Sequence, residues 1–204
     1  MKNKVLAILG SGELGQQIKH LAISDGHFKE VIFYDDFNLS INIKGTSEDL
    51  LNDYQNGVFD FLLIGIGYNH LIKRDELYQR FKNYIPFYKL IHSSSYIDSS
   101  SNISDGVIIY PRCVIDKDVS IDSNSILNLN NVVSHNSVIG RSSFLAPSVN
   151  IAGFTTIGNC CFIGIGTIII DNIKICSNVK LGASSLILKN INEEGTYILK
   201  SKKI

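Results

Sequence analysis

Aliphatic residues recur every six positions through most of the second half of this chain. From Ile97 to Ile187, sixteen successive positions six residues apart all hold Ile, Leu or Val. Chance would produce such a run with a probability on the order of one in ten million. A helix cannot use this period, because its apolar face recurs about every 3.6 residues. The second half is therefore predicted to be a repeat built from short strands.

The residues around each aliphatic position describe one side of a coil. Two residues earlier, most repeats carry a small or β-branched residue that would share the inner face of a short strand with the aliphatic one. One residue later, Gly, Asp or Asn is common, and these residues suit a tight corner that needs special backbone angles. Three such sides would close a triangular coil, so the repeat predicts about five stacked coils and a column roughly 25 Å long. The general rule for parallel crossovers favours a right-handed coil.

Charge and cysteine usage exclude several classes of protein. Lys plus Arg number 19 and so do Asp plus Glu, which argues against a general binder of nucleic acid or anionic membranes. No run approaches the roughly 18 apolar residues that span a bilayer, and the N-terminus lacks a signal-peptide pattern. The four cysteines have no CxxC spacing and no accompanying histidine cluster, so no metal site is expected. We expect a cytoplasmic protein with buried, reduced thiols.

The first half has the pattern of a small α/β unit of parallel type. Apolar runs predict strands at residues 4–9, 31–34, 59–66 and 87–91, and helical spacing predicts helices at 16–23 and 71–81. Gly10-Ser11-Gly12-Glu13-Leu14-Gly15 follows the first strand as a G-x-G-x-x-G turn, and Asp35 lies about 20 residues further on. Such a turn offers helix N–H groups to a phosphate. A purely structural glycine turn and an NAD site are the alternatives, and NAD is disfavoured because no second half of a dinucleotide domain follows.

The repeat [LIV]-G-x4 resembles that of the hexapeptide acyltransferases, from Ser95 to about Leu188. This resemblance implies a trimer of left-handed parallel β-helices, against the general rule for handedness. The two halves together resemble a narrower family, the sialic-acid O-acetyltransferases and nucleotide-amino-sugar N-acetyltransferases of bacterial glycan synthesis. The matching segments are residues 10–15, 35–36, 64–65 and 90–92.

The narrower resemblance implies two domains with separate tasks. Residues 1–92 would form an α/β Rossmann-like domain that holds the nucleotide of the sugar substrate. Residues 93–204 would form an all-β left-handed parallel β-helix that binds acetyl-coenzyme A and carries out catalysis. The implied substrate-binding residues are Gly10, Gly12, Leu14, Gly15, Asp35, Asp36 and Gly65.

Acetyl transfer from a thioester to an amine needs a base and a donor to the oxyanion. Of the five histidines, only His135 lies inside the repeat, two positions after inward-pointing Val133 and so near a corner. From the residues alone, a neutral surface histidine fits equally well. The family pattern V-x-H-[DE]-x-x-I-G makes His135 the catalytic base. The resemblance also implies that the N–H of Gly153, one coil further on, contacts the acetyl carbonyl, and that the cofactor groove includes Phe144, Gly153, Ile165, Ala183 and Lys189.

Four departures from the family pattern bear on the chemistry. Asn136 replaces the acid that follows the histidine, so a weaker base or another acid reaching in is expected. Phe144 stands where a second histidine is frequent, and Leu14 replaces a frequent histidine in the glycine turn. The usual G-V-P-A-K tail becomes residues 198–203, whose lysines could meet coenzyme A phosphates or be solvated.

These observations predict a homotrimeric N-acetyltransferase. It would move an acetyl group from acetyl-coenzyme A to the amino group of a UDP- or dTDP-linked amino-deoxy sugar, with His135 and Asn136 at the catalytic centre and no metal. One alternative is a sugar O-acetyltransferase. Asn136 slightly disfavours it, because a hydroxyl acceptor needs a stronger base than an amine does and Asn136 lacks the charge that would strengthen His135. Another is a non-catalytic trimer that only binds nucleotide sugar. An NAD oxidoreductase comes last.

Overall fold

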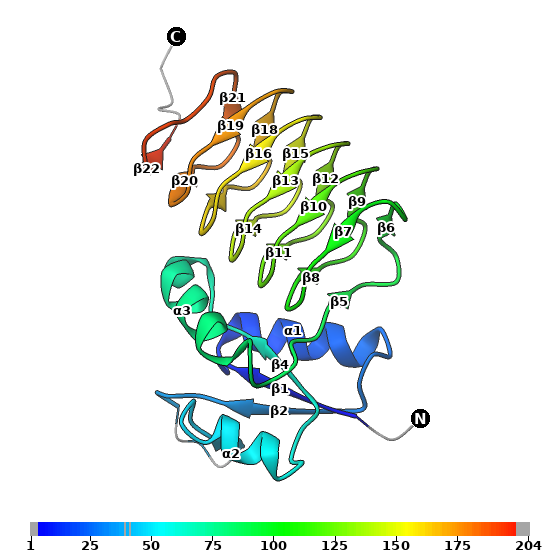
Figure 1. Cartoon of the computed structure of the whole chain (residues 1–204), viewed down its shortest axis with the longest axis vertical. Helices are drawn as coiled ribbons and strands as arrows, with labels where there is room; N and C mark the ends of the chain where they lie inside the picture. The colour runs from blue at the N-terminus through cyan, green and yellow to red at the C-terminus, as the bar shows by residue number, and fades with distance from the viewer. Residues whose placement is uncertain (1–3, 39, 41, 199–204) are drawn as a thin grey trace. The chain divides into compact units, whose positions relative to one another are not determined.

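The computed structural model describes residues 4–38, 40 and 42–198, and it divides into two compact units (Figure 1). The first unit is Met1–Leu90 and the second is Ile91–Ile204. This division falls two residues before the predicted boundary at residue 92.

The first unit is a four-stranded parallel sheet with helices. Its strands lie in the order β3-β2-β1-β4. The strand bounds are β1 Val5–Leu9, β2 Glu30–Tyr34, β3 Ile43–Gly45 and β4 Phe61–Ile64, and the helix bounds are α1 Glu13–Ser24, α2 Leu50–Gln55, the 3-10 helix η1 Tyr68–His70 and α3 Leu71–Phe81. The predicted strands and helices are present, except at residues 87–91, whereas β3 and α2 carry no strong periodicity and were not predicted.

The predicted strand at residues 87–91 is wrong as a single element. Phe87 makes only an isolated bridge to Leu62 of β4, and Tyr88 N donates to the Leu62 carbonyl at 3.2 Å. Leu90–Ile91 form a separate two-residue strand, β5, in a sheet of the column. The apolar run thus serves two different sheets, a distinction that hydrophobicity alone does not record.

The second unit is a parallel β-helix of short strands. From β6 to β21 almost every strand has two residues, and its last residue is a member of the six-residue ladder. The bounds are β6 Tyr96–Ile97, β7 Asn102–Ile103, β8 Ile108–Ile109, β9 Val114–Ile115, β10 Ser120–Ile121, β11 Ile126–Leu127, β12 Val132–Val133, β13 Val138–Ile139, β14 Phe144–Leu145, β15 Asn150–Ile151, β16 Thr156–Ile157, β17 Phe162–Ile163, β18 Ile168–Ile169, β19 Lys174–Ile175, β20 Val179–Leu181, β21 Leu186–Ile187 and β22 Gly195–Tyr197.

The coils stack with the predicted register of three hexads. Ile121 pairs with Ile103 below and Ile139 above, 18 residues away in each direction. The strands fall into three sheets, with the orders β19-β16-β13-β10-β7, β22-β20-β17-β14-β11-β8-β5 and β21-β18-β15-β12-β9-β6. Fourteen of the sixteen ladder residues are buried in one cluster, and Ile97 and Ile187 at the two ends pack against it. The sixteen-member ladder is therefore confirmed as the core of the column.

The corners differ from the sequence expectation in one respect. The left-handed backbone angles lie three residues after each ladder position, for example at Asn124, Asn130 and Asn136, all with φ near 60°. The glycines one residue after the ladder have another role. A Cβ on Gly140 would lie 2.5 Å from the backbone of Gly158 in the next coil, and a Cβ on Gly164 would lie 2.6 Å from Gly182. These glycines permit close stacking of coils rather than special angles.

Small polar residues two positions before the ladder satisfy buried backbone groups. Ser143 Oγ donates to the Gly158 carbonyl at 2.9 Å and accepts from Cys161 N at 3.0 Å. Ser125 bonds in the same way to Gly140 and Ser143. Because a buried N–H or C=O without a partner is costly, each hydroxyl stabilises the corner that it shares with the next coil.

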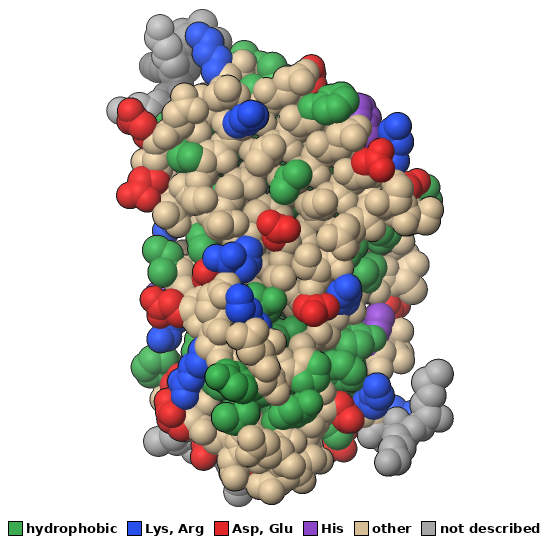
Figure 2. Space-filling view, in the orientation of Figure 1, with side chains coloured by type: hydrophobic (Ala, Val, Ile, Leu, Met, Phe, Trp, Pro, Cys, Tyr) green, Lys and Arg blue, Asp and Glu red, His purple; other side chains and the backbone are tan. Residues whose placement is uncertain are grey.

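Among the described residues, no helix is long and apolar enough to cross a bilayer. Charged side chains of both signs are scattered over the described part of the face seen in Figure 2, without a single basic patch. This face therefore offers no broad positive surface to the phosphates of a ligand.

Candidate active site

His135 lies in the corner between β12 and β13, where its main chain is fixed on both sides. Its backbone N donates to Asp116 Oδ2 at 3.2 Å, one coil earlier, and its carbonyl accepts from Phe154 N at 3.0 Å, one coil later. Asp116 Oδ1 also accepts from Lys117 N at 2.8 Å. Sequence reasoning expected an acid to reach in without identifying it. Asp116 does so, but it contacts the main chain of His135 rather than the ring.

The imidazole of His135 has a distinct partner on each side. Its Nδ1 lies 3.1 Å from Asn136 Oδ1, an oxygen that can only accept, so in this arrangement Nδ1 carries the proton. A Cβ on Gly153 would lie 2.6 Å from His135 Cε1 and 2.8 Å from Nε2. The ring therefore rests directly on Gly153, and Nε2 is left as the basic nitrogen. Phe154 meets the imidazole edge to face, with ring centroids 5.1 Å apart.

Asn136 has a backbone reason to be where it is. Its φ is 58°, a left-handed conformation that Asn adopts more readily than most other residues. The replacement of the family acid thus gives the corner a residue suited to its angles, while the amide oxygen still holds the His135 ring. What is lost is the negative charge beside an imidazolium.

The residues expected to bind the cofactor lie on several parts of the column. Gly153 and Lys189 are in the same row of corners as His135, and Lys189 is three coils above it. Ile165 and Ala183 are exposed, one coil apart, at the corner that follows β17 and β20. Phe144 begins β14 and is 5% exposed, and its ring centroid lies 6.0 Å from that of Phe162. Within a single column, Ile165 and Ala183 therefore lie at a different corner from His135. The tail lysines at 200, 202 and 203 lie outside the described residues.

One outer face of the column is apolar. In the sheet β21-β18-β15-β12-β9-β6, the first residue of each strand points outward, because its neighbour is on the inner ladder. Tyr96, Val114, Ile168 and Leu186 at these positions are between 41% and 59% exposed, Val132 is half-buried, and Asn150 is the one polar residue among the six. The equivalent positions of the sheet β19-β16-β13-β10-β7 are mostly polar: Asn102, Ser120, Val138, Thr156 and Lys174. The apolar face lies between the His135 corner and the Ile165 corner.

In the first unit, three glycines of the predicted nucleotide site pack against one another. A Cβ on Gly15 would lie 2.0 Å from the Gly10 carbonyl, and one on Gly65 would lie 2.7 Å from the same atom. Gly10 has a φ of +108°. Gly12, in contrast, has nothing within 4 Å of an added Cβ and is the N-cap of α1, without a side-chain cap. Packing of the chain explains Gly10, Gly15 and Gly65, whereas Gly12 is free of that constraint. Leu14, predicted beside it, lies half-buried in the first turn of α1.

The two aspartates after β2 organise the loop that follows. Asp35 Oδ2 accepts from the backbone N and the hydroxyl of Ser11, each at 2.7 Å. Burial alone would raise the pKa of Asp35, but these bonds and those from the N–H groups of Phe37 and Asn38 outweigh it and lower the pKa. The Asp36 carboxylate accepts from the N–H and from the hydroxyl of Ser47, at 2.7 and 3.0 Å. Asp35 thus ties the start of this loop to the glycine turn, and Asp36 ties it to the segment between β3 and α2.

A polar cavity of about 680 Å³ opens beside the glycine turn. Ser11, Gln16, Lys19, Asn38 and Lys44 are among the residues that line it. None of the seven predicted substrate residues lines it. Sequence reasoning missed Lys19 and Lys44, because single lysines on a helix and an edge strand carry no motif.

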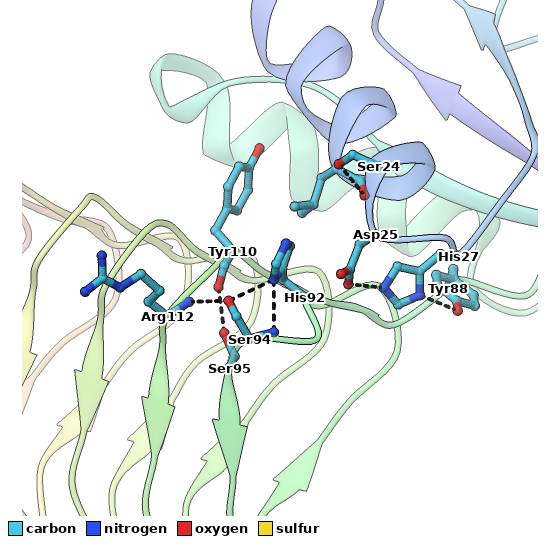
Figure 3. A network of polar contacts seen from close by, with 10 residues as sticks. Ser24, Asp25, His27, Tyr88, His92, Ser94, Ser95, Tyr110 and Arg112 are labelled. Atoms are coloured by element: carbon cyan, nitrogen blue, oxygen red, sulfur yellow. Dashed lines mark hydrogen bonds and ion pairs between the residues drawn. The ribbon is translucent and has the colours of Figure 1, made fainter.

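The structure places two other histidines in polar networks, shown in Figure 3. In the first unit, His27 lies between Tyr88 Oη and Asp25 Oδ2, each at 3.0 Å. In the second, His92 Nδ1 accepts from Ser94 N at 3.0 Å and lies 2.9 Å from Ser94 Oγ, which accepts from Arg112 N. His92 Nδ1 thus caps the turn at the start of the column. These contacts give His92 a structural role in that turn.

Comparison with known proteins places the fold. Residues 154–189 match the family of bacterial transferase hexapeptide repeats (six repeats). No curated protein matches the chain. Among solved structures, the acetyltransferase domain of PglB from Neisseria gonorrhoeae in complex with acetyl coenzyme A is 25% identical, with a TM-score of 0.87 over 96% of each chain.

A second solved structure has the same two-unit fold. PerB from Caulobacter crescentus, in complex with CoA and GDP-perosamine, is 21% identical, with a TM-score of 0.85 over 97% of this chain and 95% of that chain. The column is a left-handed parallel β-helix, so the handedness implied by the resemblance is confirmed and the general crossover rule is wrong here. The repeat match over residues 154–189 and the shared fold agree with the resemblance of this chain to the bacterial hexapeptide-repeat acetyltransferases.

Proposed function

We propose that this protein is an acetyl-coenzyme A-dependent N-acetyltransferase of a nucleotide-linked amino-deoxy sugar, acting in the cytoplasm in bacterial glycan synthesis. The observation that carries the proposal is the position of His135 on Gly153, with Nε2 within 2.8 Å of where a Cβ would stand. A base nitrogen and a main-chain amide without a side chain lie side by side, which is what acyl transfer to an amine requires.

The reaction would use these groups in sequence. The sugar amine attacks the thioester carbonyl carbon while His135 Nε2 accepts its proton. The Gly153 N–H donates to the oxygen that becomes negative in the tetrahedral intermediate. The C–S bond then breaks, and the sulfur leaves as the thiol of coenzyme A after it receives a proton from His135. Asn136 keeps the proton on Nδ1, so the correct nitrogen faces the amine.

The proposal includes a trimer, because one column does not assemble the donor site. Ile165 and Ala183 are at a different corner from His135, and the apolar face with Tyr96, Val114, Ile168 and Leu186 lies between the two corners. Burial of that face against another column would remove exposed apolar surface from water. It would also bring the His135 corner of one copy toward the Ile165 corner of the next, with Phe144 and Lys189 as further candidates for the donor side.

The first unit would hold the nucleotide of the acceptor. Gly12 leaves open space at the N-terminus of α1, where N–H groups attract a phosphate. Gly10, Gly15 and Gly65 shape this turn, Asp35 is bonded to Ser11 within it, and Leu14 and Asp36 are further candidates for contact with the substrate. The GDP-sugar bound by the Caulobacter protein adds GDP to the UDP and dTDP expected from the sequence. Binding of the three nucleotides to the purified protein would separate them.

The test of the reaction is the substitution His135→Ala. Turnover, followed as released thiol on a panel of nucleotide amino sugars, should fall about a thousandfold, because base catalysis supplies 10²–10⁴-fold. Binding of coenzyme A should persist. His20→Ala, an exposed histidine of α1, is the matched control and should keep its activity. Unchanged kcat in His135→Ala would disprove this mechanism, and thiol release only with hydroxyl acceptors would identify an O-acetyltransferase.

A further inference from the structure

One corner of the column breaks the pattern of the others. Fourteen described residues three positions after the ladder have a positive φ, and most of them are Asn, Ser or Gly. Phe154, with φ 57°, is the one aromatic residue among them. Asn136 and Asn172 occupy the same position in the coils below and above.

The conformation of Phe154 is unfavourable for its residue type. A bulky side chain rarely adopts left-handed angles, and such outliers cluster at functional sites. Burial of the side chain offsets only part of this conformational cost, because Phe154 is 54% exposed. Asn would satisfy the corner better, as it does in the neighbouring coils. The corner therefore keeps Phe for a reason outside its own stability.

The location of Phe154 indicates that reason. It follows Gly153 directly, its N donates to the His135 carbonyl at 3.0 Å, and its ring lies edge to face with the imidazole. Phe154 is thus an exposed aromatic side chain directly beside the imidazole that would take the proton of the acceptor amine. The acetyl carbonyl, in contrast, belongs at the amide of Gly153.

We propose that Phe154 is a specificity-determining residue for the acceptor. Its exposed ring contacts the apolar edge of an amino-deoxy sugar, the C–H groups and methyl beside the reacting amine, and disfavours acceptors that carry a hydroxyl there. The contact rests on the proposed function. An aromatic ring supplies a large, rigid apolar surface, which the Asn, Ser or Gly found at most of these corners would not supply.

The test is Phe154→Asn, which gives the corner its common residue, together with Phe154→Leu, which keeps an apolar surface. With acetyl-coenzyme A held constant, KM for the acceptor should rise about tenfold in Phe154→Asn and less in Phe154→Leu. KM for acetyl-coenzyme A should stay unchanged. A pair of acceptors that differ only by methyl or hydroxymethyl next to the aminated carbon should show a preference of about tenfold in the parent protein, and Phe154→Asn should lose it.

Stability provides a readout that separates this role from a structural one. Phe154→Asn relieves the strained conformation, so Tm should be unchanged or higher while the acceptor preference is lost. Cys160→Asn, six residues later at the equivalent position of the next corner, is the matched control and should leave the acceptor KM unchanged. A lower Tm with an unchanged acceptor KM would make Phe154 a packing residue and overturn the proposal. A change confined to the acetyl-coenzyme A KM would overturn it as well.

Failure of this inference can be told from failure of the proposed function. If the parent protein acetylates an amino sugar and depends on His135, but Phe154→Asn keeps its acceptor KM and preference, only the role of Phe154 is wrong. If the parent protein acetylates no amino sugar, the proposed function is wrong, and the proposed contact of Phe154 with the acceptor is wrong as well.

Discussion

The column and the α/β unit carry their candidate functional residues in different ways. In the column, every residue has equivalents 18 positions away, so the packing role of a position can be read from its neighbours. His135, Gly153 and Phe154 are visible as departures from that repeat. In the α/β unit no position repeats, and a glycine must be judged by what surrounds it. Gly10, Gly15 and Gly65 are explained by contact with one another, and Gly12 is not.

This difference teaches where a sequence motif is informative. The G-x-G-x-x-G turn is mostly a packing device, since two of its three glycines keep β1, β4 and α1 close together. Only the central glycine has open space in front of it. In the column, the repeat itself is structural, and the deviation from it carries the chemistry.

The largest expected effect is on the packing of the glycine turn. Gly15→Ala would place a Cβ 2.0 Å from the Gly10 carbonyl, a backbone atom that cannot rotate away. We expect a loss of roughly 3 kcal/mol or more in the free energy of unfolding, measured by denaturant titration. Gly12→Ala, with nothing within 4 Å, should leave that free energy nearly unchanged and weaken nucleotide binding instead. Equal losses of stability in both variants would remove the distinction between the two glycines.

The ladder should respond to the loss of one inner side chain. Ile121 is fully buried between Ile103 and Ile139, so Ile121→Ala leaves a cavity in the middle of the column. The expected cost is about 3 kcal/mol in the free energy of unfolding. Ser120→Ala, its outward neighbour on β10, should cost less than about 0.5 kcal/mol. A comparable cost for both would mean that the inner face of the coil does not carry its stability.

Gly153→Ala tests whether the departure at the His135 corner is catalytic. The added methyl would lie 2.6 Å from the imidazole and push the ring from its place. We expect kcat to fall about a hundredfold, or about 2.7 kcal/mol in the activation barrier, with the fold retained by circular dichroism. In the double variant with His135→Ala, the two losses should not add, because both act on one ring. Full additivity would show that Gly153 acts independently of His135.

Much of the column could be predicted because its period is long and strict. The position of Gly153 against His135 follows from the register alone. The contact of Asp116 with the His135 main chain could not be predicted, since it depends on which rotamer a corner aspartate adopts. Phe154 was missed for a related reason. The sequence locates the corner but does not show that its left-handed angle falls on this residue rather than on the glycine beside it.

The α/β unit was less predictable because its short elements depend on tertiary contacts. β3 has three residues and α2 has six, too few for periodicity to be recognised. The loop between them is held by Asp36 and Ser47, 11 residues apart, a pairing that no local pattern records. The resemblance identified Asp36 as a candidate for the substrate, and the structure shows the packing role that it has in the loop.

The smallest effect at neutral pH distinguishes the thiols of the column by burial, and it grows only as the pH is raised. Burial raises the pKa of Cys113 and of Cys161 to about 11, whereas an unfolded thiol titrates near 9. The folded state therefore holds these protons more tightly, so stability is fully present below pH 9 and falls as the pH rises from about 9 to 11, by about 1.4 kcal/mol per pKa unit and so by up to about 3 kcal/mol for each thiol. Cys113→Val with Cys161→Val should flatten this alkaline loss in denaturant titrations, since Val119 and Val149 show that Val fits the same position of the repeat. Cys160→Ser removes a partly exposed thiol and gives this corner a residue that Ser142 and Ser148 show it accepts; it is the control and should keep the loss. If the paired variant lost stability over the same pH range as the parent, groups other than the buried thiols would control the alkaline transition.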